Sequence, residues 1–218
     1  MIDLHTHSLF SDGELIPSEL VRRVETLGFE AVAITDHADS SSLDFIIPRV
    51  VRVADDLNRT QKVRVIPGVE LTHIPPVLLK RLVRKARTLG AKLVVVHGET
   101  IVEPVAPGTN SAALAAGVDI LAHPGLLTRE EARTAAEKEI FLEISGRKGH
   151  SLTNGHVAKL AVEWGARLVL NSDSHSPGDF MPQALARKVV QGAGLPASGF
   201  QDLLSNARLL LDRIGCSL

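Results

Sequence analysis

Nine histidines, several of them beside aspartate or glutamate, are the part of this 218-residue sequence best suited to chemistry. Imidazole nitrogens and carboxylate oxygens are ligands that zinc, manganese and iron bind in proteins. His5 and His7 are two residues apart, so on a β-strand their side chains point to the same side and could hold one ion. Asp173 and His175 repeat this spacing near the other end of the chain. The pattern indicates a metal-binding site assembled from distant segments.

Short apolar segments alternate with longer amphipathic segments along the whole chain. From these segments, β-strands are predicted over residues 2–7, 31–37, 63–70, 92–97, 119–123, 140–145 and 167–173. Helices are predicted near residues 17–27, 43–57, 76–90, 157–164, 184–190 and 200–214. A further helix is predicted to open at Thr128 and Glu131, which have capping-box spacing. No linker or low-complexity stretch interrupts the alternation, so we expect residues 1–218 to form a single domain.

Repeated strand–helix units with apolar strands predict an α/β protein in which helices cover a parallel sheet. From the pattern alone, the sheet is either a closed barrel or an open doubly wound sheet. Both architectures place ligands at the carboxyl ends of the strands. Six of the seven predicted strands deliver a His, Asp or Glu at that end. We therefore expect these side chains to meet at one site.

The strand ends, together with the turn after the first strand, offer nine candidate metal ligands. They are His5, His7, Asp12, His37, Glu70, His97, His123, Asp173 and His175. A catalytic zinc-like ion takes about three protein ligands and keeps one position for water or substrate. Nine ligands therefore suit two or three divalent ions of Zn, Mn or Fe, with a carboxylate such as Glu70 bridging two of them. Because such ions lower the pKa of bound water from about 15.7 towards about 7, we expect a metal-bound hydroxide as nucleophile.

Composition argues against several other classes of protein. The formal net charge is −1 and aromatic residues make up 3% of the chain, which disfavours an extended nucleic-acid partner. No apolar run is long enough to span a membrane and no secretory signal is recognisable, so we expect no membrane partner and a cytoplasmic location. The single cysteine, Cys216, cannot form an intrachain disulfide. Neither a Gly-x-Ser-x-Gly nucleophile motif nor a P-loop is present.

The loop after the sixth predicted strand carries no candidate metal ligand but is basic. We expect Arg147 to bind a substrate phosphate through its guanidinium group, and His150 of the same loop to act at the site. Glu99, after the fourth strand, is either an acid or base beside the ions or a surface residue. His73 lies either at the rim of the pocket or in an ordinary loop. Residues 103–110 are rich in turn formers, which predicts a loop at the active face.

The motifs resemble, in order and over almost the whole chain, those of the PHP family, named for polymerase and histidinol phosphatase. They are Asp3-Leu4-His5-Thr6-His7, Ser11-Asp12-Gly13, Thr35-Asp36-His37, Gly68-Val69-Glu70, Val96-His97-Gly98, Ala122-His123-Pro124 and Ser172-Asp173-Ser174-His175. The resemblance implies a distorted seven-stranded β/α, TIM-like barrel with three ions at its carboxyl end. The implied ligand sets are His5, His7, Glu70 and Asp173 for one ion, Glu70, His97 and His123 for a second, and Asp12, His37 and His175 for a third.

The resemblance further implies a stand-alone phosphoesterase of the histidinol-phosphatase-like branch. The leading hypothesis is hydrolysis of a small phosphate monoester, with metal-bound hydroxide as nucleophile and Arg147 assisting phosphate binding. Three alternatives stay open: a nucleotide phosphodiesterase or nuclease, an amidohydrolase-type C–N hydrolase, and a non-catalytic metal-binding domain. The sequence indicates no oligomeric state.

Overall fold

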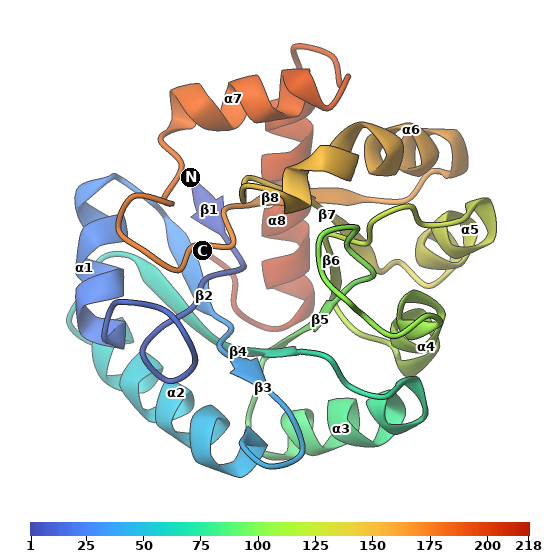
Figure 1. The fold of residues 1–218 in the computed structure, drawn as a ribbon. Helices are drawn as coiled ribbons and strands as arrows, with labels where there is room; N and C mark the ends of the chain where they lie inside the picture. The colour runs from blue at the N-terminus through green and yellow to red at the C-terminus, as the bar shows by residue number, and fades with distance from the viewer.

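Parallel strands form a ring at the centre of the molecule, and helices surround it (Figure 1). The structure is a computed structural model that describes residues 1–218. The strands are β1 (Ile2–Asp3), β2 (Ala31–Ile34), β3 (His37–Ala38), β4 (Arg64–Leu71), β5 (Leu93–His97), β6 (Ile120–Ala122), β7 (Phe141–Ser145) and β8 (Leu168–Asn171). The α-helices are α1 (Pro17–Thr26), α2 (Leu43–Asn58), α3 (Pro76–Thr88), α4 (Thr109–Ala116), α5 (Arg129–Glu137), α6 (Asn154–Trp164), α7 (Gln183–Gly192) and α8 (Gly199–Arg213).

The strands pair in parallel in the order β1, β2, β4, β5, β6, β7 and β8. A bridge between Thr6 and Ser174 joins the two ends of this order, and the His7 N–H donates to the Ser174 carbonyl at 2.8 Å. The sheet is therefore a nearly closed barrel of seven parallel strands, which confirms the predicted TIM-like barrel and excludes an open sheet. β3 continues β2 along the same neighbour, β4, after a two-residue break.

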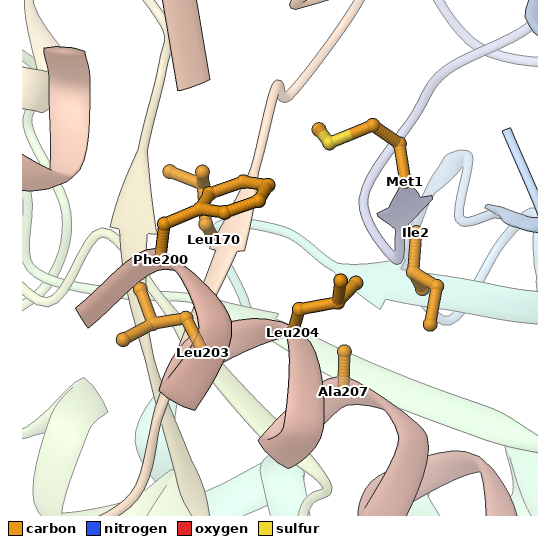
Figure 2. A pocket seen from close by; sticks show the side chains of 7 residues that line it. All are labelled: Met1, Ile2, Leu170, Phe200, Leu203, Leu204 and Ala207. Carbon is orange, nitrogen blue, oxygen red and sulfur yellow. The ribbon is translucent and has the colours of Figure 1, made fainter. Parts of the chain in front are cut away.

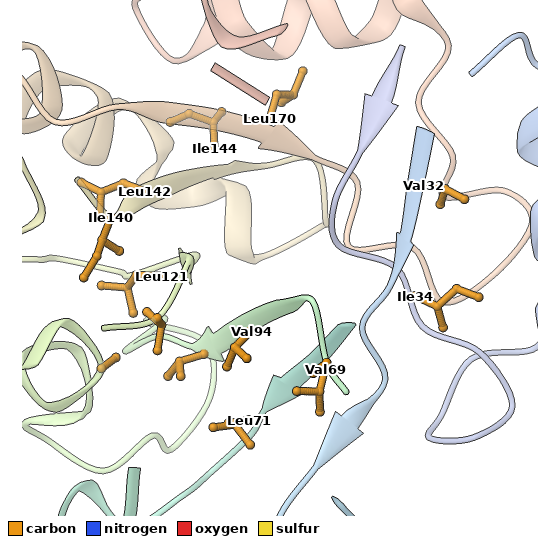
Figure 3. Packing of buried hydrophobic residues seen from close by; sticks show 14 of the residues in the cluster. Val32, Ile34, Val69, Leu71, Val94, Leu121, Ile140, Leu142, Ile144 and Leu170 are labelled. Carbon is orange, nitrogen blue, oxygen red and sulfur yellow. The ribbon is translucent and has the colours of Figure 1, made fainter. Parts of the chain in front are cut away.

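Side chains alternate between the inside and the outside of the barrel along each strand. On β5, Leu93 and Val95 belong to a buried cluster of 15 residues inside the barrel. Val94 and Val96 belong to a cluster of 49 buried residues between strands and helices, part of which is seen in Figure 3. The next inward position after Val95 is His97. The apolar layers of the interior therefore end where the candidate metal ligands begin.

Helix α8 closes the end of the barrel opposite the candidate ligands. Its residues Ala207, Leu210 and Leu211 are buried in the inner cluster together with Ile2 and Phe141, which begin β1 and β7. In Figure 1, α8 is seen through the ring, behind the strands. Burial of this apolar face seals the base of the barrel.

Every predicted helix is present, and α4 has no counterpart among the predictions. The capping box of α5 forms as expected, because the Glu131 N–H donates to Thr128 Oγ1 at 3.2 Å and the Thr128 N–H donates to Glu131 Oε2 at 2.8 Å. The α4 sequence is rich in alanine and lacks a clear apolar stripe, and Gly108 and Gly117 flank it in left-handed conformations. None of the helices combines the length and apolar character that a membrane crossing requires.

Candidate metal centre

The nine candidate ligands lie at or beside a polar cavity at the mouth of the barrel. The cavity has a volume of about 230 Å³, and no apolar residue lines it. Its lining residues are Asp12, His37, Thr72, His73, His97, Glu103, Arg147, His150, Asp173 and His175. The other four candidate ligands, His5, His7, Glu70 and His123, are no more than 2% exposed. Each of them lies within 4 Å of Asp173 or of another of the four, and His123 Nε2 is 3.6 Å from Glu70 Oε1 and 3.7 Å from Asp173 Oδ2.

One group of donors gathers around Asp173, although its members lie on β4 and on the segments that follow β1 and β8. His5 Nε2 is 3.3 Å from Glu70 Oε1 and 3.7 Å from Asp173 Oδ1. His7 Nε2 is 3.2 Å from Asp173 Oδ1 and 3.8 Å from Glu70 Oε2. Two ligands bonded to one tetrahedral ion at about 2.0–2.2 Å lie about 3.3–3.6 Å apart. These four residues are therefore spaced to share an ion.

A second group surrounds Asp12, in the turn after β1. Asp12 Oδ1 is 3.3 Å from His175 Nε2 and 3.6 Å from His37 Nε2, and these two ring nitrogens are 3.4 Å apart. With His7, they form a set whose donor atoms lie within 4.8 Å of one another. A Cβ at Gly13 would lie 2.3 Å from the His7 carbonyl oxygen, so glycine permits the close turn that brings Asp12 to the histidines.

Three imidazoles, those of His97, His123 and His150, form a third group with donor atoms within 4.8 Å. The His150 ring stacks on that of His123, with centroids 4.1 Å apart and an interplanar angle of 14°. His150 Nδ1 is 2.8 Å from Thr100 Oγ1, which leaves Nε2 towards the cavity. His150 is predicted to act on substrate, and the structure places it among possible metal ligands as well.

Several donor atoms are buried with no hydrogen-bond partner in the protein. They are His5 Nε2, His7 Nδ1 and Nε2, Glu70 Oε1, His123 Nδ1, Glu143 Oε1 and Asp173 Oδ1. A buried polar atom left unpaired costs about 1–3 kcal/mol, and more if it is charged. All but Glu143 are candidate ligands, so bound cations would satisfy the residues that most need partners. The mixed imidazole and carboxylate set fits Zn, Mn or Fe.

Burial and mutual charge shift the pKa values of these donors strongly. Burial, reinforced by neighbouring imidazoles, lowers the pKa of His7 and of His123 well below the ordinary value, so both rings are neutral at pH 7. Burial opposes ionisation of Glu70, but the charges of His5 and His37 prevail and hold its pKa well below the usual range. Neutral imidazoles and an ionised bridging carboxylate are the forms that bind metal ions.

Glu143, on β7, contacts the candidate ligand His5 and belongs to none of the sequence motifs. Its buried carboxylate oxygen Oε2 is 2.8 Å from His5 Nδ1 and accepts a hydrogen bond from Asn171 Nδ2 at 2.9 Å. A carboxylate on Nδ1 keeps a proton on that nitrogen, so an ion would bind His5 through Nε2, which faces Glu70 and Asp173. The available sequence signal is a single acidic residue in the middle of an apolar strand.

Asp36 supports the turn after β1. Its buried carboxylate accepts hydrogen bonds from the Ser8 N–H at 2.7 Å and from the hydroxyls of Ser8 and Ser11, both at 2.8 Å. Because Asp12 follows directly, Asp36 holds the segment that carries this donor into the mouth.

Two candidate ligands have strained backbone conformations. His123 has φ 26° and Asp173 has φ 53°, in a region that non-glycine residues seldom occupy. Each residue follows the end of its strand, β6 or β8, within two positions. Such strain costs about 1–3 kcal/mol and is found mainly at functional sites. His73, in the loop after β4, has φ 51°, so three of the four non-glycine residues with positive φ lie at this end of the barrel, and the fourth is Glu139, before β7.

Arg147 reaches the cavity, whereas Glu99 does not line it. Arg147 Nη1 donates to the Asp173 carbonyl at 3.1 Å and lies 2.6 Å from His175 Nδ1. The Arg147 side chain is 32% exposed, so part of the guanidinium group is available to a ligand. Glu99 Oε1 instead accepts a hydrogen bond from the Asn110 N–H at 2.9 Å. Glu99 therefore anchors the loop that leads into α4 and is apart from the candidate ligands.

Glu103, in the turn-rich loop after β5, is a cavity residue that the motifs do not reveal. Its Oε2 is 3.1 Å from His97 Nε2 and 3.4 Å from His73 Nε2, and its Oε1 is 3.4 Å from His150 Nε2. The hydrogen bond with His97 lowers the pKa of Glu103 to about 2, so the carboxylate is ionised at neutral pH. No spacing rule connects a loop residue with distant strand ends, so only the turn-rich composition pointed to this loop.

An apolar pocket between α8 and the strands β1 and β8 is separate from the polar cavity (Figure 2). Its lining residues are Met1, Ile2, Leu170, Phe200, Leu203, Leu204 and Ala207. A volume of about 10 Å³ is that of a single water-sized probe, so this pocket is a packing gap with no room for a ligand.

Similar sequences and a similar fold occur in known proteins. The family model of the PHP domain matches residues 3–94 of this chain. An uncharacterised protein from Methanocaldococcus jannaschii is 48% identical over 97% of this chain and 99% of its own length. A probable phosphatase from Shewanella halifaxensis is 30% identical over 90% of this chain and 86% of its own length. The crystal structure of histidinol phosphate phosphatase from Lactococcus lactis, complexed with zinc, L-histidinol and phosphate, has a TM-score of 0.63 at 17% identity and covers 89% of this chain and 94% of that chain.

Proposed function

This chain belongs to the PHP domain family and is a metal-dependent phosphoesterase, and from that premise we propose that it hydrolyses a small phosphate monoester. The similar probable phosphatase supports a phosphate ester as substrate. The L-histidinol and phosphate in the similar Lactococcus lactis structure support a small phosphorylated molecule, and its zinc supports a transition metal. We propose two or three ions of Zn, Mn or Fe, held by His5, His7, Asp12, His37, Glu70, His97, His123, Asp173 and His175.

The observation that carries this proposal is the position of a cationic side chain among the metal donors. Arg147 lines the same cavity as Asp12, Asp173 and His175. A guanidinium group binds phosphate oxygens through paired N–H groups, and a C–N hydrolase has no need of one there. The cavity of about 230 Å³ is smaller than typical ligand sites of about 300–1,000 Å³. Because neither an apolar nor an aromatic wall is present, the cavity suits a small polar substrate better than a polynucleotide.

When bound, divalent ions lower the pKa of a water molecule and stabilise the charge that develops on phosphoryl oxygens. The residues of the chain prepare the site for this chemistry. Glu143 orients His5, and burial keeps the rings of His7 and His123 deprotonated. Arg147 binds the phosphate of the substrate. Burial lowers the pKa of His150 to about 4, so the ring is neutral at pH 7 and its Nε2 offers a lone pair to an ion at the cavity wall.

Phosphate release tests this function directly. Metal-depleted protein is reloaded with Mn²⁺ or Zn²⁺ and assayed on a panel of phosphate monoesters, phosphodiesters and amides. We expect turnover of monoesters in preference to diesters, and loss of that turnover in His97→Ala.

The matched control is His156→Ala. His156 Nε2 faces the Leu127 carbonyl oxygen at 2.8 Å, away from the cavity, so its removal leaves turnover in place. Metal-loaded protein that hydrolyses no monoester in the panel contradicts the proposal. Faster hydrolysis of amides, retained in Arg147→Ala, would support the C–N hydrolase instead.

A further inference from the structure

Three donors at the mouth, His73, His97 and Glu103, form a group that shares only His97 with the nine assigned ligands. Glu103 Oε2 is 3.1 Å from His97 Nε2 and 3.4 Å from His73 Nε2. The rings of His73 and His97 are stacked with centroids 5.1 Å apart. All three donor atoms lie within 4.8 Å of one another. The two distances from Glu103 Oε2 to the histidine nitrogens match the separation of about 3.3 Å between two ligands of one tetrahedral zinc-like ion.

His97 has only one nitrogen that can bind an ion. Its Nδ1 is 3.2 Å from the Gly98 carbonyl oxygen. Because a carbonyl oxygen only accepts hydrogen bonds, Nδ1 keeps its proton, and an ion binds His97 through the lone pair of Nε2 after displacing the proton that Nε2 donates to Glu103. This nitrogen faces Glu103, whereas neither oxygen of Glu70 lies within 4.0 Å of it. An ion on Nε2 therefore has as its other ligands either His123 and His150 or His73 and Glu103.

We propose that His73, His97 and Glu103 form an outer site for a divalent transition-metal ion. The inner set consists of His97, His123 and His150, and the two sets exclude each other because they share one lone pair. This inference rests on the proposed metal centre.

The outer site is the more accessible of the two sets. The side chains of His73 and Glu103 are 44% and 36% exposed, whereas that of His123 is 1% exposed. An ion arriving from solvent therefore meets the outer set before it reaches the inner one. The outer site acts as a loading position for the ion that His97 finally holds.

The experiment counts zinc ions per chain by elemental analysis after excess metal has been removed. In His123→Ala, the ion on His97 takes the outer position, so the count equals that of the unaltered chain. Adding His73→Ala or Glu103→Gln to His123→Ala lowers the count by one ion per chain. His73→Ala alone leaves the count unchanged, because the inner set then holds the ion.

Two substitutions in the His123→Ala background serve as matched controls. His156→Ala removes a histidine that faces the Leu127 carbonyl, and Glu99→Gln alters a carboxylate that holds the Asn110 N–H. Neither is expected to lower the count. Cobalt(II) in place of zinc gives a second readout, because its visible absorption reports a tetrahedral site. Circular dichroism confirms that each variant is folded.

Three results would overturn the proposal: loss of an ion in His123→Ala alone, an unchanged count in both double variants, or loss of an ion in His73→Ala alone. His73 and Glu103 are partly exposed residues on different loops, so a folding defect in one variant leaves the other as a test. None of these counts uses phosphate release. An inactive enzyme would contradict the proposed function and leave the ion counts interpretable.

Discussion

The carboxylate of Glu143 determines which nitrogen of His5 faces the metal donors, because it lies 2.8 Å from Nδ1. Removing it in Glu143→Ala frees the ring, and we expect zinc affinity to fall about 10- to 100-fold. Glu143→Gln keeps an oxygen that accepts a hydrogen bond from Nδ1, so we expect it to lose less zinc affinity than Glu143→Ala. Competition with a chelator measures both affinities. Equal affinities for Glu143→Ala and the unaltered chain would show that Glu143 has no orienting role.

We expect the loss of Arg147 to weaken substrate binding without weakening metal binding. A hydrogen bond to a charged group contributes about 1.5–3 kcal/mol, so Arg147→Ala is expected to raise KM about 10- to 100-fold. Arg147→Lys keeps the charge without the planar fork and is expected to be intermediate. Steady-state phosphate release gives KM, and elemental analysis gives the ion content, which we expect to stay constant. A lower ion content in Arg147→Ala would indicate that Arg147 chiefly supports His175.

The residues that the sequence predicts well are those that obey a geometric rule. His5, His97 and Asp173 stand at strand ends, where a parallel barrel brings side chains together whatever their separation in the chain. Glu103 reaches the cavity from a loop, and loop conformation depends on contacts that no periodic pattern records. Glu143 occupies an inward position on a fully buried strand, where alternation between apolar and polar residues gives no clear phase.

Among the elements, the ends of β5 and β6 depend on one glycine. The Gly98 N–H donates to the Ala122 carbonyl at 3.0 Å, and a Cβ at position 98 would lie 2.3 Å from that oxygen. Gly98→Ala forces these strand ends apart, so we expect a loss of about 1–3 kcal/mol in unfolding free energy. Metal binding should weaken too, because His97 and His123 stand on these ends. Urea unfolding and zinc titration measure the two effects.

Gly192→Ala, at the end of α7, is the control for that substitution. No atom lies within 4 Å of the Cβ it would add, so the free energy of unfolding should stay the same or rise slightly. A similar loss for both variants would show that the effect at Gly98 is not due to its contact with Ala122.

The elements could be predicted where their pattern is strong. The segment of residues 140–145 is apolar except for Glu143 and Ser145 and becomes β7, and the capping-box residues Thr128 and Glu131 start α5 as expected. α4 escapes prediction because its alanines pack without a distinct apolar stripe. The sequence leaves the open or closed state of the sheet undecided, because closure depends on contacts between residues at opposite ends of the chain, such as the bridge between Thr6 and Ser174 and the hydrogen bond from the Leu4 N–H to Asn171 Oδ1.

For the whole molecule, removal of the ions is expected to lower stability, because buried donors then have no partner. A ligand at 100 times its Kd stabilises the folded state by about 2.7 kcal/mol, equivalent to about 5–10 °C in Tm for a chain of this size. Calorimetry with and without a chelator measures this shift. An unchanged Tm would contradict metal binding to the buried donors.

Acid is expected to release the ions, because protons compete for the imidazole lone pairs. Burial opposes protonation of His37, but the negative charge of Glu70 prevails and raises the pKa of His37. Burial likewise opposes protonation of His97, and its hydrogen bond to Glu103 prevails and raises the pKa of His97. Affinity is therefore fullest at alkaline pH and falls as the pH drops through values above about 6.5, the ordinary pKa of histidine. Ion content after dialysis at stepwise lower pH checks this sign. Retention that is independent of pH would contradict it.

Because α8 closes the base of the barrel, the cavity at the mouth is the entrance to the site. If the chain hydrolyses a phosphate monoester as proposed, the substrate enters, and the alcohol and inorganic phosphate leave, through the cavity that Arg147 lines. A phosphate ion that lingers there blocks the next turnover, so inorganic phosphate should inhibit competitively. The loops at the mouth can then set the rate at which phosphate leaves, whereas the closed base maintains the barrel.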